Sequence, residues 1–141
     1  MSPQPAGHLF GDEHVRSYLE TDGEVGYLWR EDSTIAILTT TGRVTGEQHL
    51  HPLIFGRDGE SIVLVASKGG APAHPGWYRN LVKHPDAQVQ ILGDRFPVRA
   101  RTAEGEERDR LWRLMNTIWP HYDAYQAKTD REIPVVVLDP G

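Results

Sequence analysis

The chain has 141 residues, 38% of them hydrophobic, and a formal net charge of -5 with His neutral. A net negative chain disfavours nucleic acid as a partner, and the absence of cysteine excludes disulfides and thiolate metal sites or nucleophiles. The length fits one domain, expected at 13–141 after a mobile tail at 1–12. No apolar run is long enough to cross a bilayer, so we expect a cytoplasmic protein without stable membrane insertion.

The first half of the chain predicts one short helix and then a run of strands. The helix is expected at 14–20. Residues 32–41 accumulate apolar and β-branched side chains, which favours a strand buried on both faces. Two more strands are expected at 48–55 and 61–67, with the turn signal Arg57-Asp58-Gly59 before the second. We predict these three strands in meander order.

The second half predicts helices inserted singly among hairpin strands. Proline suits the first turn of a helix, and Gly93-Asp94 is typical of a hairpin turn. The expected elements are a helix at 75–84, strands at 87–92 and 95–102, a helix at 104–118 and a strand at 133–138. This order does not match a doubly wound sheet. It indicates a mainly β, α+β fold: a small antiparallel barrel with peripheral helices.

Two glycine-marked loops each carry a cation: Thr39-Thr-Thr-Gly-Arg43 and Ala66-Ser-Lys-Gly-Gly70. Arginine grips phosphate or carboxylate with two prongs, lysine adds a point charge, and glycine lets backbone amides approach a ligand closely. The loops therefore indicate a polyanionic cofactor. From spacing alone, an ordinary solvated turn at 67–70 and a surface hairpin cation at Arg43 stay open.

Further motifs follow in order at Pro52-Leu53, Pro75, Trp77-Tyr78, Asn80-Leu81 and Thr129-Asp-Arg-Glu-Ile-Pro134. With the two loops, they make the chain from about residue 33 onward resemble the deazaflavin-dependent nitroreductase family. The resemblance implies a split β-barrel of the flavin-oxidase type that binds coenzyme F420. It also implies hydride transfer from reduced F420 to a small electron-poor acceptor such as a quinone or nitroaromatic. A non-catalytic F420-binding or storage protein, and a split-barrel oxidoreductase that uses FMN, are the alternatives; the chain is expected as a monomer or homodimer.

The resemblance also implies site residues, whose cofactor contacts are Arg43, Val44, Thr45, His49, Leu50, His51, Pro52, Leu53, Ile54, Val65, Ala66, Ser67, Lys68, Gly76, Trp77, Tyr78, Arg79 and Asn80. We expect Ser67 and adjacent amides to hydrogen-bond the deazaflavin ring, while Lys68 and Arg43 hold its anionic tail. Trp119, Tyr122 and Tyr125 match the substrate pocket. Ser67 and the two tyrosines are the catalytic candidates, since a tyrosine hydroxyl orients a carbonyl or nitro group or supplies a proton. Without the family, aromatics at this spacing are more often core.

Three positions depart from the family. Val44 replaces a lysine of close relatives, His49 an arginine, and Ile54 a tyrosine. The F420 tail carries a phosphate and glutamate carboxylates, so losing two fixed cations should weaken its binding, and a protonated His49 would restore part of it. The pocket should also be more apolar beside Ile54.

Two other patterns have ordinary interpretations. His49 and His51 share one strand face at a spacing that can hold a metal, but no third ligand stands at a partner spacing, so we expect no metal. Asp130 and Arg131 are interpreted as an ion pair that stabilises a turn.

Overall fold

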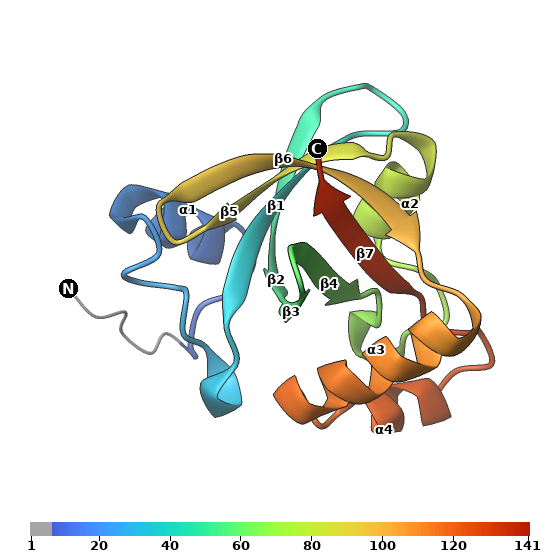
Figure 1. Cartoon of the computed structure of the whole chain (residues 1–141). Helices are drawn as coiled ribbons and strands as arrows, with labels where there is room; N and C mark the ends of the chain where they lie inside the picture. The colour runs from blue at the N-terminus through green and yellow to red at the C-terminus, as the bar shows by residue number, and fades with distance from the viewer. Residues whose placement is uncertain (1–6) are drawn as a thin grey trace.

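The computed structural model describes residues 7–141 and contains one seven-stranded antiparallel sheet that curls into a half-barrel (Figure 1). The sheet order is β2-β1-β5-β6-β7-β4-β3. The strands are β1 (Ile35–Thr41), β2 (Gln48–Ile54), β3 (Gly56–Asp58), β4 (Ser61–Val65), β5 (Asp86–Ile91), β6 (Asp94–Thr102) and β7 (Val135–Pro140). The expected mainly β, α+β architecture is thus confirmed.

The sheet curls because its two edge strands are nearly continuous in sequence. β2 and β3 lie at opposite edges, yet only Phe55 separates them. Phe55 is buried, and its N–H donates to the carbonyl of Thr34 at 3.2 Å. A Cβ on the next residue, Gly56, would lie 2.6 Å from Sδ of Met115, so glycine lets β3 approach the helix α3 (Gly105–Ile118). The bend therefore brings the chain from one edge of the sheet to the other.

The predicted meander of the first three strands is wrong. β1 and β2 pair as expected, but β4 pairs with β3 and β7, and its registered partners include Val65 with Val135. The reason is the extra strand β3 after the bend at Phe55, which carries β4 away from β2. A local turn signal could not distinguish these pairings.

Apolar runs in β4 and β7 are buried on both faces of the sheet. Successive strand residues point to opposite faces, so Ile62 and Leu64 pack into one cluster and Val63 and Val65 into another. The first cluster includes Trp77 and the second includes residues of α3. This two-sided burial explains why the sequence shows continuous apolar runs rather than alternation.

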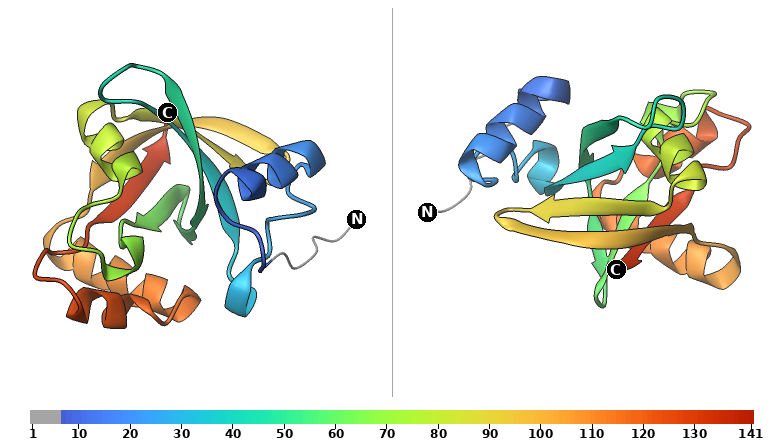
Figure 2. Two further views of the ribbon diagram at one scale, coloured as in Figure 1. Left: turned by 180° about the vertical axis from the view of Figure 1, so that it is seen from behind. Right: turned by 90° about the horizontal axis from the view of Figure 1, so that it is seen from above.

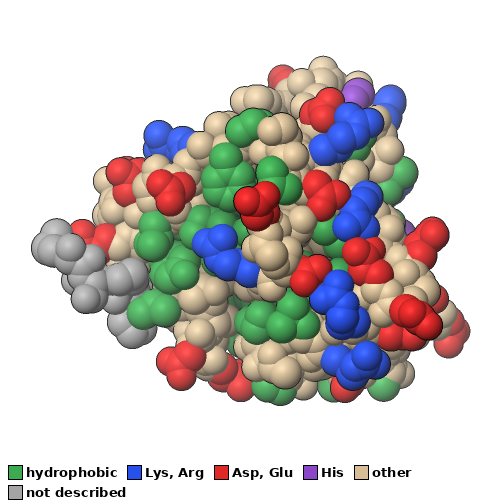
Figure 3. Space-filling view, viewed as in Figure 1, with side chains coloured by type: hydrophobic (Ala, Val, Ile, Leu, Met, Phe, Trp, Pro, Cys, Tyr) green, Lys and Arg blue, Asp and Glu red, His purple; other side chains and the backbone are tan. Residues whose placement is uncertain are grey.

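Four helices surround the sheet: α1 (Gly11–Thr21), α2 (Gly76–Lys83), α3 and α4 (Tyr122–Ala127), with short 3₁₀ turns η1 (Arg30–Asp32) and η2 (Lys68–Gly70). Figure 2 shows α1 beside the sheet on the opposite side from α3. No helix within residues 7–141 is long and apolar enough to span a membrane. On the face shown in Figure 3, acidic and basic side chains are interspersed, in keeping with ion pairs such as Arg101 with Glu107.

The expected tail at 1–12 is wrong for residues 7–12, while 1–6 lie outside the described residues. Leu9 is buried, and α1 begins at Gly11 rather than at residue 14. Trp29 Nε1 donates to the Leu9 carbonyl at 2.8 Å, and the guanidinium of Arg30 lies 5.3 Å from the Phe10 ring centroid. These contacts attach the segment to the barrel.

Candidate functional site

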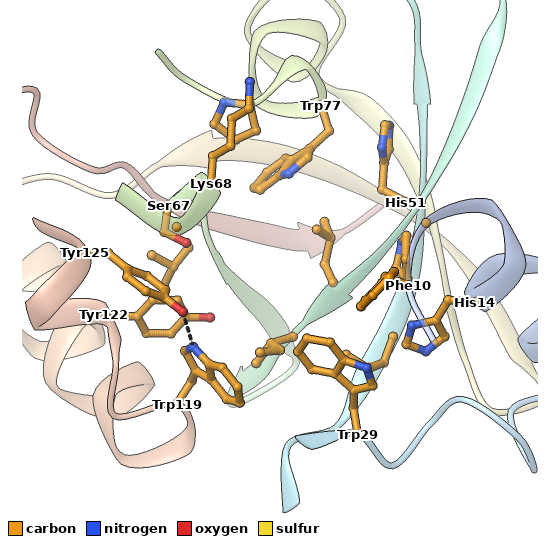
Figure 4. A pocket seen from close by; sticks show the side chains of 18 of the residues that line it. Phe10, His14, Trp29, His51, Ser67, Lys68, Trp77, Trp119, Tyr122 and Tyr125 are labelled. Carbon is orange, nitrogen blue, oxygen red and sulfur yellow. Dashed lines mark hydrogen bonds between the residues drawn. The ribbon is translucent and has the colours of Figure 1, made fainter. Parts of the chain in front are cut away.

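A cavity of about 460 Å³ opens beside the sheet, between its strands and the ends of the helices (Figure 4). The structure brings to it many of the residues that the sequence indicated. Those lining it are His51, Pro52, Leu53, Ile54, Val65, Ser67, Lys68, Gly76, Trp77, Trp119, Tyr122 and Tyr125. They come from β2, β4, η2, α2 and the segment around α4, so residues more than seventy positions apart share one space.

The other expected cofactor residues lie outside this cavity. They are Arg43, Val44, Thr45, His49, Leu50, Ala66, Tyr78, Arg79 and Asn80. Arg43 is adjacent to it, because Nη1 donates to the carbonyl of Gly76 at 3.4 Å. Val44 is 87% exposed, so the position where the family resemblance led us to expect a lysine projects into solvent. A ligand tail leaving past Gly76 would therefore meet one fixed cation at Arg43 and none at Val44.

The loop between β1 and β2 is attached to α2 through Arg43. The backbone N–H of Arg43 and its Nη1 both donate to Oδ1 of Asn80, at 3.2 and 2.9 Å. Lys83 Nζ donates to the Arg43 carbonyl at 2.8 Å. The two cationic side chains thus fasten the loop to α2, with Arg43 contacting Gly76 at its first residue and Lys83 reaching the loop from its last.

The loop at Ser67 and Lys68 is held by a residue near the far end of the chain. Arg131 donates to the carbonyls of Ser67 at 2.7 Å, Ala71 at 2.8 Å and Ala66 at 3.2 Å. Its Nη1 also donates to Nδ1 of His74 at 2.9 Å, and since a guanidinium only donates, that nitrogen is unprotonated. Burial, followed by the charge of Arg131, lowers the pKa of His74. The expected ion pair between Asp130 and Arg131 is therefore wrong.

Left-handed backbone shapes this loop. Lys68, Gly69 and Gly70 all have positive φ, of 47°, 64° and 84°. A Cβ at Gly70 would lie 2.6 Å from the Tyr125 carbonyl, so glycine is required where the loop meets α4. Lys68 is exposed at the mouth of the cavity, whereas Ser67 is buried beside it. The loop thus presents a hydroxyl inside and a cation outside.

The wall of the cavity next to this loop is aromatic, and Figure 4 shows Tyr122 and Tyr125 close to Ser67. The rings of Trp29 and Trp119 stack with centroids 5.7 Å apart, and Trp119 Nε1 donates to the Tyr125 hydroxyl at 3.2 Å. Tyr122 is 4% exposed, and its hydroxyl has no hydrogen-bond partner within residues 7–141. Burial raises the pKa of Tyr122, so its hydroxyl stays protonated and is a hydrogen-bond donor for whatever occupies the cavity.

Sequence reasoning missed the N-terminal side of the cavity. The missed lining residues on this side are Phe10, Gly11, His14, Trp29 and Ile35, whereas Gly69 and Pro75, which also line the cavity, belong to the loop and the motif that the sequence indicated. His14 Nε2 is 2.8 Å from the Gly26 carbonyl, and burial lowers its pKa, which favours a neutral ring that donates. The aromatics Phe10 and Trp29 were the one available signal, but they precede the first strand and carry no periodic pattern.

Comparison with known proteins identifies the family to which a chain with this cavity belongs. The family described as F420H(2)-dependent quinone reductase matches residues 11–140. The chain belongs to this family. It is 38% identical over 128 residues to an F420H(2)-dependent quinone reductase of Mycobacterium tuberculosis, covering 89% of this chain and 86% of that protein.

Solved structures agree with the family. An F420-H2 dependent reductase, FDR-A, superposes with a TM-score of 0.70 at 42% identity, over 74% of this chain and 93% of its own. A structure described as a domain-swapped dimer superposes with a TM-score of 0.71 at 37% identity, over 89% of this chain and 96% of its own. The predicted family resemblance and the split-barrel fold are thereby confirmed.

Membership of this reductase family also confirms the expected enzyme class and F420 as the cofactor, in preference to FMN. The cavity fits the group. Apolar walls at Leu53 and Trp77 suit a planar ring and Ser67 supplies a hydroxyl, while Lys68 at the mouth and Arg43 beside Gly76 are cations that an anionic tail could meet. These side chains would hold reduced F420, whose chemistry is donation of a hydride.

Proposed function

We propose that this protein transfers a hydride from reduced F420 to a quinone. The observation that supports this is a single cavity whose wall carries both cationic and aromatic side chains. Ser67 and Lys68 supply a hydroxyl and a cation, and Trp119, Tyr122 and Tyr125 on the adjoining wall supply aromatic rings and phenolic hydroxyls. A charged cofactor suits the first group and a flat apolar acceptor suits the second, so the two reactants would be held side by side.

The protein's contribution is chiefly orientation. When bound, reduced F420 supplies two electrons and a proton together as a hydride, and the quinone oxygen that becomes negative takes a second proton to give the hydroquinone. The Tyr122 hydroxyl, which lines the cavity, would donate a hydrogen bond to that oxygen, and its raised pKa would keep it a donor while the proton arrives from solvent. Trp29 and Trp119 bound the acceptor space and exclude water from its apolar side.

The acceptor pocket is apolar where Ile54 faces it. The family resemblance led us to expect a tyrosine there, and with isoleucine the pocket has one hydroxyl fewer to orient a polar acceptor. We propose that quinones with apolar substituents are reduced faster than nitroaromatics, which share the planar, electron-poor character but present a more polar group.

The decisive experiment is turnover by the purified protein. Reduced F420 is mixed with a quinone, a nitroaromatic or no acceptor, and oxidation of F420 is followed by its absorbance. We expect acceptor-dependent oxidation, fastest with the quinone. Tight F420 binding without oxidation under any acceptor would support a storage protein, and tighter binding of FMN than of F420 would overturn the cofactor assignment for this chain.

A further inference from the structure

The side-chain amide of Asn80 has a fixed orientation. Asn80 is 5% exposed, and the two groups facing its Oδ1 are the backbone N–H and Nη1 of Arg43. Both groups only donate, so the amide oxygen must face them. The amide nitrogen then faces β1 and donates to Oγ1 of Thr40 at 3.1 Å. Arg43 therefore fixes the orientation of the Asn80 side-chain amide.

The amide in turn sets the direction of the next hydrogen bond. The Thr40 hydroxyl is buried and lies 3.2 Å from Nε2 of His51. It accepts from Asn80, and within residues 7–141 His51 is its other side-chain partner. A hydroxyl can accept twice, but accepting from His51 as well would leave its own buried hydrogen without an acceptor within residues 7–141. The hydroxyl hydrogen is therefore directed to Nε2, which is then the unprotonated ring nitrogen. In a neutral imidazole the proton is then on Nδ1.

His51 lines the cavity near Trp77 and across from Ser67 (Figure 4). Its Nδ1 has no hydrogen-bond partner within residues 7–141 and is not fully buried, so a ligand in the cavity can reach it. Burial, followed by the neighbouring His49, lowers the pKa of His51 to about 4. The ring is therefore neutral at physiological pH and has one free N–H.

We propose that the connected groups Arg43, Asn80, Thr40 and His51 fix His51 as the Nδ1–H tautomer, and that this N–H donates to a carbonyl oxygen of the deazaflavin ring. The identity of that acceptor rests on the proposed function; the tautomer does not. The same hydrogen bonds join the two ends of the cofactor site. Arg43, which holds the anionic tail, also determines through Asn80 that the ring end meets a donor rather than an acceptor.

The tautomer is tested by ¹⁵N NMR of the histidine rings in the ligand-free protein, with His51→Gln to assign the signals. We expect Nδ1 protonated and Nε2 bare. The variant Asn80→Asp keeps an oxygen for Arg43 but cannot donate to Thr40. The hydroxyl then donates to the carboxylate and accepts from Nε2–H, so the tautomer should reverse.

Thr40 supplies the matched pair of controls. Thr40→Ser keeps the hydroxyl and should preserve the Nδ1–H tautomer of His51. Thr40→Val removes the hydroxyl, so His51 should then populate both tautomers. A wild-type His51 protonated on Nε2, or one charged at neutral pH, would overturn the proposal. So would an Asn80→Asp variant that folds with the tautomer unchanged.

The ring contact is tested with the deazaflavin nucleoside that lacks the phosphate and glutamate tail, titrated by fluorescence quenching. Its Kd reports the ring end alone. We expect Asn80→Asp and His51→Phe each to raise it roughly three- to tenfold, the effect of losing one hydrogen bond, and Thr40→Ser to leave it unchanged. Unchanged Kd values in both variants would overturn the ring contact. If the wild type bound neither this nucleoside nor F420, the proposed function would fall, and the NMR result would still decide the tautomer.

Discussion

Replacing Arg131 with alanine should destabilise the protein and the loop at residues 66–71 in particular. The side chain makes four hydrogen bonds, to the carbonyls of Ala66, Ser67 and Ala71 and to the ring of His74. A net contribution of about 1 kcal/mol for each, reduced because water can reach part of this site, gives a loss of about 3 kcal/mol in the free energy of unfolding. For a domain of this size that lowers Tm by roughly 10 °C.

The same variant should weaken F420 binding. Arg131 holds the backbone on either side of the residues expected to contact the cofactor, so without it the loop must be ordered at the moment of binding. We expect the F420 Kd to rise by about tenfold. Thermal unfolding followed by circular dichroism measures the first effect, and fluorescence quenching by F420 titration measures the second.

Two control variants make this prediction specific. Arg113→Ala removes an exposed arginine of α3 that has no ion pair within residues 7–141, and should change neither Tm nor Kd. Arg131→Lys keeps the charge but replaces the planar guanidinium, which reaches several carbonyls at once, by a single ammonium group. Its Tm and its F420 Kd should lie between those of the wild type and those of Arg131→Ala. If Arg131→Ala kept the wild-type Tm and Kd, these hydrogen bonds would not position the loop.

Three further predictions concern the cations near the cofactor tail and the Tyr122 hydroxyl. Lys68→Ala should raise the F420 Kd about tenfold, measured by titration, because one charge-assisted contact is lost; an unchanged Kd would mean that this lysine does not touch the tail. Val44→Lys adds a cation at an exposed position and should lower the F420 Kd roughly threefold, with a steeper dependence of Kd on salt concentration than the wild type shows. The same salt dependence in variant and wild type would count against a cofactor tail that passes this loop. Tyr122→Phe should reduce the rate of quinone reduction about tenfold while leaving Tm within about 2 °C, since its hydroxyl has no partner to lose; full activity in a steady-state assay would remove the hydroxyl from the mechanism.

Local pattern predicted most of the elements. The hairpin of β5 and β6 and the helix α3 lie within a residue or two of their expected bounds, because turn chemistry and apolar periodicity act over a few residues. Strand pairing was less accessible. The bend at Phe55 joins the two edges of the sheet, and the pairing of β4 with β7 connects segments about seventy residues apart.

The site divides in the same way. The loops at Arg43 and Ser67 were recognisable because cations beside glycine have a local meaning for anion binding. The aromatic side of the cavity was predicted at Trp119, Tyr122 and Tyr125 but not at Trp29, whose place in the site depends on stacking against Trp119. Arg131 was assigned to its sequence neighbour, although its partners lie some sixty residues earlier.

The sequence by itself determined a small cysteine-free barrel with two cation-bearing glycine loops, and its family resemblance indicated F420. Only the tertiary structure shows which edge strands the chain links and which aromatics line the cavity, and only it supports the tautomer that we propose for His51. The physical reason is the distance along the chain over which each effect acts. Turn and strand preferences depend on neighbouring residues, whereas a hydrogen-bond direction passed from Arg43 through Asn80 and Thr40 exists only once α2 packs against β1.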